Sequence, residues 1–391
     1  MSTHASPASA GTFQLTADQA EIREMARTFA AERLAPNAIE WDHEKHFPTD
    51  VLREAAELGL GGIYVREEHG GSGLSRLDAA LIFDALAEGC PTVSAYISIH
   101  NMVAWMVDCY GTDEQRATWL RRLCSMEIFG AYCLSEPASG SDAAALEMRA
   151  VRDGDAYMVD GVKQFISAAG VAGLYIVMVR TGEPGPRGIT ALLVDGSTEG
   201  LTFGRLEDKM GWNAQPTRPV VLEGARVPVG NRLGDEGSGF KIALAGLDGG
   251  RVNIGACSLG GAQAAFDKSV RYTAERTAFG APLSALQTVQ FQLADMATDL
   301  EAARGLLWRA ASALDAGEPS ATQLCAMAKR FATDACLAVA DRALQLHGGY
   351  GYLAEYGLEK LVRDLRVHQI VEGTNEIMRL IIARGVVGAS R

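Results

Sequence analysis

Three long segments in the second half of the chain constrain the fold most. Residues 240–274, 283–315 and 318–346 each carry apolar side chains along one face and have no proline in their interiors. Helices of this length bury an apolar face by packing on one another. Shorter helical segments follow at 356–366 and 373–388. The pattern predicts a four-helix bundle at the C-terminal end of the chain.

The two regions before the bundle have different patterns. The first third is helical throughout, and Thr16 is the expected N-cap of a helix that Pro36 ends. Between Ile128 and about residue 235, short β-rich runs are separated by Gly, Pro, Asp and Asn, which predicts six to eight strands in a small barrel or two-sheet sandwich. The fold class is therefore α+β, mainly α. We expect an N-terminal α-helical domain (1–127), a β domain (128–238) and a C-terminal α-helical bundle (239–391).

Local signals place individual elements. Further helices are expected after Thr49 as far as Gly61, over 76–90 and 92–110, and from Asp113. In AVRDGDAYMVDGVKQFIS, two Asp-Gly pairs predict two turns between alternating segments, and LYIVMVRT and ITALLVDG read as continuous apolar strands.

Composition excludes several classes of protein. The chain has 391 residues with 36 basic and 48 acidic side chains, and the formal charge of −12 argues against nucleic acid or an anionic membrane as the main partner. No run approaches the ~20 apolar residues of a membrane span. The N-terminus has no apolar core and no arginine before Arg23, so we expect no leader and a cytoplasmic protein.

Cysteine and histidine usage points away from disulfides and metals. The seven cysteines are odd in number and form no CxxC pair, which predicts buried thiols in a reducing compartment. His43 and His46 are three residues apart, but no further ligand joins them, so no metal site is predicted. There is no GxGxxG after a strand and no P-loop motif, so any dinucleotide must bind in another way.

Glu372, in QIVEGTNEIMRL, is the most informative single residue. It stands between an apolar stretch and a glycine at an expected helix start. One interpretation is a solvated acid in the first turn of a helix. The other is a carboxylate in apolar surroundings, whose pKa is raised and which acts as a general base toward a weakly acidic carbon-bound proton. Position alone leaves both open.

Four other stretches carry chemistry, each with an ordinary alternative. AYCLSEPASGSD (131–142) is a polar loop, and KQFISAAG (163–170) places an aromatic and a hydroxyl on one strand face, which a protein core also explains. In GLDGGRVNIG (from 246), Asp248 and Arg251 are three apart and could form a surface ion pair. The fourth group is spread over ERTAFG, LQTVQF and QLHGG, whose glycines tight helix packing would also explain.

Together these stretches resemble the acyl-CoA dehydrogenases, flavoproteins with an α domain, a β domain and a helical bundle. The resemblance implies FAD as cofactor, and Glu372 as catalytic base. A minority of the family keeps its glutamate just before the arginine of the third stretch, where this chain has Gly250. Many members carry Trp where this chain has Phe165. The implied FAD contacts are Tyr132, Cys133, Leu134, Ser135, Ser141, Phe165, Ile166, Ser167, Arg276, Leu286, Gln287, Gln345, Leu346, His347, Gly348, Gly349, Thr374, Asn375 and Glu376. The implied substrate contacts are Ser141, Asp248, Gly249, Gly250, Arg251 and Arg384.

The resemblance also implies the reaction and the partners. Glu372 would take the α-proton of an acyl-CoA while the β-hydrogen leaves as hydride to flavin N5. GWNAQPTR (211–218) and the third stretch look most like the branch that acts on isobutyryl-CoA in valine breakdown, with short straight-chain and 2-methylbutyryl-CoA as alternatives. An electron-transferring flavoprotein would accept the electrons, and a homotetramer (a dimer of dimers) is expected. A flavin oxidase on the same scaffold and a non-catalytic acyl-CoA-binding or nucleic-acid-binding relative stay open, although Glu372 counts against nitroalkane oxidation, which generally uses Asp.

Overall fold

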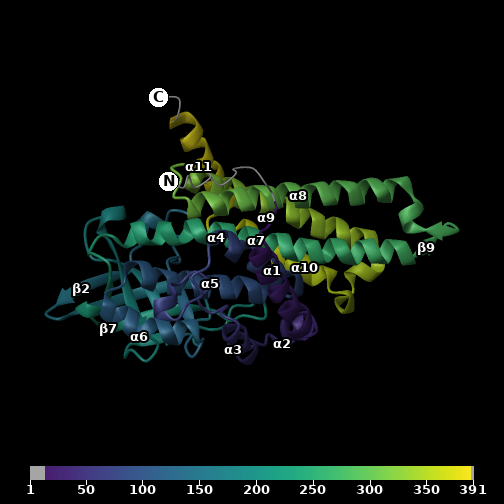
Figure 1. Cartoon of the computed structure of the whole chain (residues 1–391). Coiled ribbons are helices and arrows are strands. Elements are labelled where there is room, and N and C mark those ends of the chain that lie inside the picture. The colour runs from purple at the N-terminus through teal and green to yellow at the C-terminus, as the bar shows by residue number, and fades with distance from the viewer. Residues whose placement is uncertain (1–13, 389–391) are drawn as a thin grey trace, which may run out of the picture.

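The structure is a computed structural model that describes residues 14–388. Residues 1–13, where we expected no leader, lie outside the described part. Helices come first along the chain (Figure 1). They are α1 (Ala17–Phe29), α2 (Ala38–Glu44), α3 (Thr49–Glu57), α4 (Arg76–Gly89), α5 (Pro91–Tyr110) and α6 (Asp113–Cys124).

Side-chain caps begin three of these helices. Thr16 Oγ1 accepts from the backbone N–H of Gln19, and the Gln19 side chain accepts from the N–H of Thr16, each at 3.2 Å. This capping box satisfies two N–H groups that have no partner inside the helix. The predicted N-cap is confirmed, and the same box starts α4 at Ser75 and α6 at Thr112.

One helix was not singled out from the sequence, and one helix boundary was wrong. Helix α2 lies between Pro36 and Thr49, within the region expected to be helical, and ends where Lys45 adopts a left-handed backbone with φ 51°. Seven residues are too few for an apolar period to stand out. The helix expected to reach Gly61 stops at Glu57, and its C-cap is Leu58.

The middle region forms one sheet made of two halves. Its strands are β1 (Gly130–Cys133), β2 (Arg149–Asp153), β3 (Ala156–Ser167), β4 (Leu174–Arg180), β5 (Ile189–Asp195), β6 (Leu201–Phe203), β7 (Thr217–Pro228) and β8 (Arg232–Leu233). The order is β6-β7-β3-β2-β4-β5-β8, with β1 parallel to β4. A single residue pair, Arg149 with Arg180, joins β2 to β4, so the two halves meet at a corner. This is the sandwich form of the expected β domain.

Strand β4 shows why its sequence is continuously apolar. Tyr175 and Val177 belong to the core that the two half-sheets share, whereas Ile176 and Met178 pack in the cluster formed with helices. A strand buried on both faces needs apolar residues at every position. The turn expected at Asp160–Gly161 was wrong, because β3 runs through it with a register shift between Val159 and Gly161, a β-bulge.

The C-terminal region is the predicted bundle. It contains α7 (Gly239–Glu275), α8 (Gln287–Asp315), α9 (Ala321–His347), α10 (Leu358–Arg366) and α11 (Asn375–Gly388). A small hairpin, β9 (Thr277–Ala278) with β10 (Ala281–Pro282), lies between α7 and α8 at the end of the bundle remote from β2 and β7 (Figure 1). Helix α4 also packs against α7 and α8.

Glycines in α7 permit this close packing. A Cβ atom at Gly260 would stand 1.9 Å from the backbone oxygen of Asp84 in α4, and one at Gly255 would stand 2.4 Å from Leu307 Cδ2 in α8. No larger residue fits at either position without moving a helix.

The changes of element type fall where the domain boundaries were expected. Helices give way to strands between Cys124 and Gly130, and strands give way to helices between Leu233 and Gly239. The division into domains itself stays a prediction. Within residues 14–388, no helix combines the length and apolarity that a membrane span requires. All seven cysteines are free, and only Cys109 is exposed, so the expectation of buried thiols is confirmed for the other six.

Candidate active site

Glu372 lies on a bend between two helical segments. The turn Val367–Gln369 precedes it and α11 begins at Asn375. Glu372 has φ 56° and Gly373 has φ 90°, so both residues are left-handed. The left-handed region is uncommon for a non-glycine residue and costs about 1–2 kcal/mol. Such strain persists only where the surroundings fix it.

The carboxyl group of Glu372 is enclosed. The residue is half-buried, but its Oε2 is buried and has no hydrogen-bond partner within residues 14–388. A Cβ atom at Gly250 would stand 2.4 Å from Oε2, so only glycine leaves the carboxyl group room in this place. Burial raises the pKa of Glu372 to about 7, and the positive charges of Arg251 and Lys329 act in the opposite direction. The interpretation of Glu372 as a solvated first-turn acid is wrong.

Arg251 connects the bend that carries Glu372 to α7. It is buried, forms an ion pair with Asp248, and donates from Nε to the backbone oxygen of Glu372 at 3.4 Å. Asp248 also accepts from Thr322 Oγ1 in α9 at 2.6 Å. The pair is therefore partly buried and connects α7, α9 and the bend, so it is not the surface ion pair considered from the sequence.

Tyr132 approaches the same place from the sheet. Its hydroxyl oxygen is buried without a hydrogen-bond partner within residues 14–388. Burial raises its pKa well above the usual value of a tyrosine, and the charges of Glu372 and Arg251 both reach it. Two unpartnered polar atoms, Glu372 Oε2 and Tyr132 Oη, thus lie in one region, which is where a ligand would supply partners.

A buried ion pair holds the loop after β1. Lys163 in β3 is fully buried and donates to Glu136 at 2.7 Å and to the backbone oxygen of Leu134 at 3.0 Å. Glu136 also accepts from the N–H groups of Glu147 and Met148. This pair fixes the loop 131–142 beside the strand that carries Phe165. Sequence reasoning gave neither residue a role, although a lysine inside an otherwise apolar strand face was a usable signal.

Phe165 presents a large apolar face. It lies where the register of β3 against β7 shifts, has φ 61°, and is 66% exposed, whereas the next residue, Ile166, is 2% exposed. Ser167 pairs with Thr217 of β7. Cys133, in β1, is buried, and burial raises its pKa to about 12, so this thiol is unreactive.

Some of the residues at the start of α11 already make hydrogen bonds within the chain. Thr374 caps it, with Oγ1 accepting from the N–H of Ile377 at 3.3 Å. Asn375, expected to contact a cofactor, is buried and its side chain is bound to Lys329, Thr333 and Asp334 of α9. Glu376 is exposed. Arg384 is exposed on α11, roughly 13 Å along the helix from Asn375 at 1.5 Å per residue, and the structure does not bring it to Glu372.

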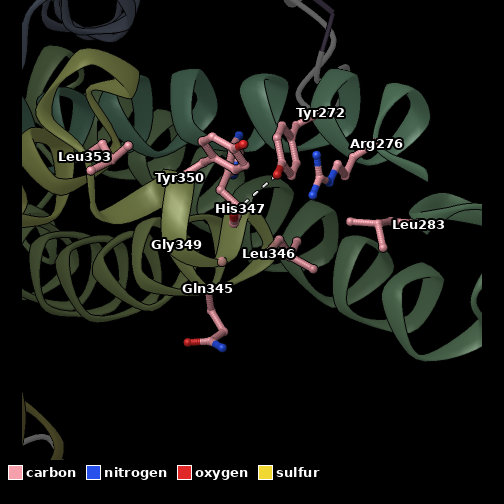
Figure 2. A pocket seen from close by; sticks show the side chains of 10 residues that line it. Tyr272, Arg276, Leu283, Gln345, Leu346, His347, Gly349, Tyr350 and Leu353 are labelled. Atoms are coloured by element: carbon pink, nitrogen blue, oxygen red, sulfur yellow. Dashed lines mark hydrogen bonds between the residues drawn. The ribbon is translucent and has the colours of Figure 1, made fainter. Parts of the chain in front are cut away.

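A second group of expected residues forms a pocket of about 420 Å³ at the far end of the bundle (Figure 2). Arg276, Gln345, Leu346, His347, Gly348 and Gly349 line it. Sequence reasoning missed Tyr272, Leu283, Tyr350 and Leu353, which complete the lining. Tyr272 stacks on His347 with 4.2 Å between ring centroids, and its hydroxyl donates to the backbone oxygen of His347. Leu286 and Gln287 are outside this lining.

The remaining expected contacts are two loop residues, Ser135 and Ser141, and Gly249, which is buried in α7. Ser135 is half-buried and its backbone oxygen accepts from the N–H of Gln164 at 2.8 Å. Ser141 is exposed near the end of the same loop. A Cβ atom at Gly249 would stand 2.6 Å from Arg76 Nη1, so this glycine makes room for a guanidinium that also lies over the ring of Tyr64.

Comparison with known proteins identifies the family. Matches to the N-terminal, middle and C-terminal domains of acyl-CoA dehydrogenases cover residues 16–127, 131–225 and 237–387. Mitochondrial isobutyryl-CoA dehydrogenase of Dictyostelium discoideum is 56% identical over 95% of this chain and 89% of its own length, and that of Bos taurus is 52% identical over the same shares. The structure of butyryl-CoA dehydrogenase from Megasphaera elsdenii has a TM-score of 0.94 at 37% identity, covering 96% of this chain and all of that one. The chain belongs to the acyl-CoA dehydrogenase family, a family of oxidoreductases.

Proposed function

We propose that this protein is an FAD-dependent dehydrogenase of short branched acyl-CoA esters, with isobutyryl-CoA as substrate and methacrylyl-CoA as product. The observation that carries the proposal is the enclosed, unpartnered carboxyl group of Glu372 against Gly250. Identity of 56% to an isobutyryl-CoA dehydrogenase supports this choice of substrate. Valine breakdown is the pathway this reaction would serve.

The residues present fit a flavin dinucleotide. The exposed face of Phe165 is suited to a flat ring, and the free N–H groups at the start of α11 are suited to a pyrophosphate. Tyr132, whose hydroxyl has no partner, lies on the strand before the loop that the Lys163–Glu136 pair holds. Bound FAD supplies the acceptor for the β-hydrogen and its electron pair.

Glu372 performs the proton transfer. Its ionised carboxylate takes the α-proton, the C–H electron pair forms the α,β double bond, and the β-hydrogen leaves with its own pair. A pKa of about 7 suits a base that works near neutral pH. The backbone N–H of Glu372 donates to no acceptor within residues 14–388, so it is free to polarise the thioester oxygen. Enclosure of the site strengthens each of these interactions.

A second copy of the chain completes the proposal. The pocket at Arg276 lies roughly 37 Å along α7 from Arg251, at 1.5 Å per residue. A ligand beside Glu372 would therefore meet this pocket on another subunit. Exposed aromatic side chains at the same end of the bundle, Phe279 and Phe291, favour an interface there. We propose a homotetramer built as a dimer of dimers, with an electron-transferring flavoprotein as the acceptor. A cytoplasmic location stays a prediction.

Anaerobic titration of the flavin-loaded protein tests the function. Isobutyryl-CoA should bleach the flavin spectrum fastest, ahead of butyryl-CoA, 2-methylbutyryl-CoA and octanoyl-CoA. Because pockets separate single methylenes by only ~1–3 kcal/mol, weaker bleaching by close relatives is expected. Absence of flavin from the purified protein, or no bleaching by any ester, would contradict the proposal. Rapid oxygen consumption by the reduced protein would instead favour an oxidase.

A further inference from the structure

We infer that Lys329 is the positioning residue of the base: it fixes the bend that carries Glu372 and places a positive charge behind the carboxylate. The inference rests on the proposed function. Lys329 was not among the residues that the sequence indicated.

The contacts of Lys329 are confined to the bend. It lies in α9 and is fully buried, and its Nζ donates to the backbone oxygen of Gly373 at 2.8 Å and to Asn375 Oδ1 at 2.9 Å. No carboxylate lies within ion-pair distance of Nζ in the described part of the chain. A fully buried lysine normally pairs with an acid. Here the ammonium group instead donates to the backbone carbonyl of Gly373 and to the side-chain amide of Asn375.

Both acceptors lie on the C-terminal side of Glu372, one on the left-handed residue Gly373 and one at the start of α11. Gly373 follows Glu372 directly, and Asn375 is the first residue of α11. Asn375 is itself held, because its Nδ2 donates to Asp334 Oδ1 at 2.6 Å and to Thr333 Oγ1 at 2.9 Å. Lys329 therefore clamps the bend to α9, just as Arg251 holds it to α7 through the backbone oxygen of Glu372.

The charges around Glu372 and Lys329 determine in which direction the pKa of Glu372 moves when Lys329 is replaced. Glu372 faces two cations, Arg251 from α7 and Lys329 from α9, and its charge also reaches the neutral groups of Tyr64, Tyr132 and Cys257. Lys329 faces Glu372, Arg251, Asp334 and Glu376, and its charge also reaches the buried ring of His368. Burial lowers the pKa of Lys329 to about 8, so it is mostly charged at pH 7. Removing this charge destabilises the carboxylate and raises the pKa of Glu372.

Two substitutions of Lys329 separate its positive charge from its hydrogen bonds to the bend. Lys329→Met removes the charge and both hydrogen bonds, whereas Lys329→Gln removes the charge and keeps a donor. In both, the pH profile of flavin reduction should move upward by roughly one unit, the scale of a neighbouring charge. The rate at pH 7 should fall about fivefold in each, because a one-unit rise from a pKa of about 7 lowers the ionised fraction of Glu372 from about one half to about one tenth. Amide exchange at residues 373–376 of the flavin-free protein should accelerate in Lys329→Met and stay closer to wild type in Lys329→Gln.

Lys268→Met is the matched control. Lys268 is a half-buried lysine whose Nζ likewise donates to a backbone oxygen, that of Tyr356 at 2.8 Å. It stands on α7 roughly 27 Å from Gly250 at 1.5 Å per residue, so the pH profile should not move. An unshifted profile in both Lys329 variants, or an equal shift in Lys268→Met, overturns the inference. If no acyl-CoA reduces the flavin of the wild-type protein, the proposed function is refuted instead. In that case amide exchange still tests the contact of Lys329 with the bend, and exchange at 373–376 that is not accelerated in Lys329→Met would overturn it.

Discussion

The carboxyl group of Glu372 lies against the backbone of Gly250, where a Cβ atom would stand 2.4 Å from Oε2. Gly250→Ala should therefore displace the carboxyl group while favouring the helix, since alanine is better than glycine in a helix interior by about 1 kcal/mol. We expect flavin reduction to slow at least 100-fold, because misplacement of a reacting group by about 1 Å has that effect. Stopped-flow absorbance with isobutyryl-CoA measures the rate, and the melting temperature shows whether the fold is kept. A rate within threefold of wild type would mean that the carboxyl group works from another position.

Glu372→Gln removes the proposed base and keeps its shape. Flavin reduction should fall by several orders of magnitude while acyl-CoA still binds, which isothermal titration can measure. In the wild type, the rate should rise with pH around an apparent pKa near 7, because the carboxylate form is the base. Near-normal reduction by the variant would place the base elsewhere.

The same substitution should change stability in a pH-dependent way. The pKa of Glu372 is raised from 4.5 to about 7 in the folded protein, so the folded state binds more protons than the unfolded state between these values. Stability is therefore lost as pH rises through this window. Glu372→Gln should stabilise the flavin-free protein by about 2–3 kcal/mol at pH 8 and by little at pH 4.5. Urea unfolding at both pH values measures the difference, and an equal effect at both would contradict the raised pKa.

Substitutions of Lys163 and Glu136 should have coupled effects on the free energy of unfolding. Lys163→Met leaves Glu136 buried without its cation, and breaking a buried pair in this way costs about 3–5 kcal/mol. The released loop should also lower the flavin content of the purified protein. The double variant Lys163→Met/Glu136→Gln should recover part of the stability, which a double-mutant cycle by urea unfolding quantifies. Additive losses would show that the two side chains do not depend on each other.

Alanine substitutions of the neighbours Phe165 and Ile166 should separate flavin binding from stability of the fold. Phe165→Ala removes a side chain that is 66% exposed, so the flavin-free protein should keep its stability within about 0.5 kcal/mol. FAD binding should weaken about tenfold, the scale of one aromatic contact. Ile166→Ala, at a position 2% exposed, should instead destabilise the fold by about 2–5 kcal/mol. Fluorescence titration of the flavin-free protein measures both affinities, and unchanged binding in Phe165→Ala would remove this residue from the flavin site.

The sequence alone determined the order of the elements, because apolar period and length are local properties. The long helices α7, α8 and α9, the continuous apolar strand β4 and the N-cap at Thr16 all follow from residues near one another. The bulge at Gly161 did not follow, because an Asp-Gly pair signals a turn unless a partner strand keeps it extended. Helix α2 was too short to show a period.

The tertiary structure alone decided the chemistry of Glu372. The sequence left a solvated acid and a buried base both open, since a pKa depends on burial and on charges brought together by the fold. Gly250, Arg251, Lys329 and Tyr132 come from three other elements, and only their convergence encloses the carboxyl group and leaves it unpartnered. Lys329 and Lys163 were missed for the same reason: a lysine is recognised as buried only when the helix or strand that carries it has found its partners.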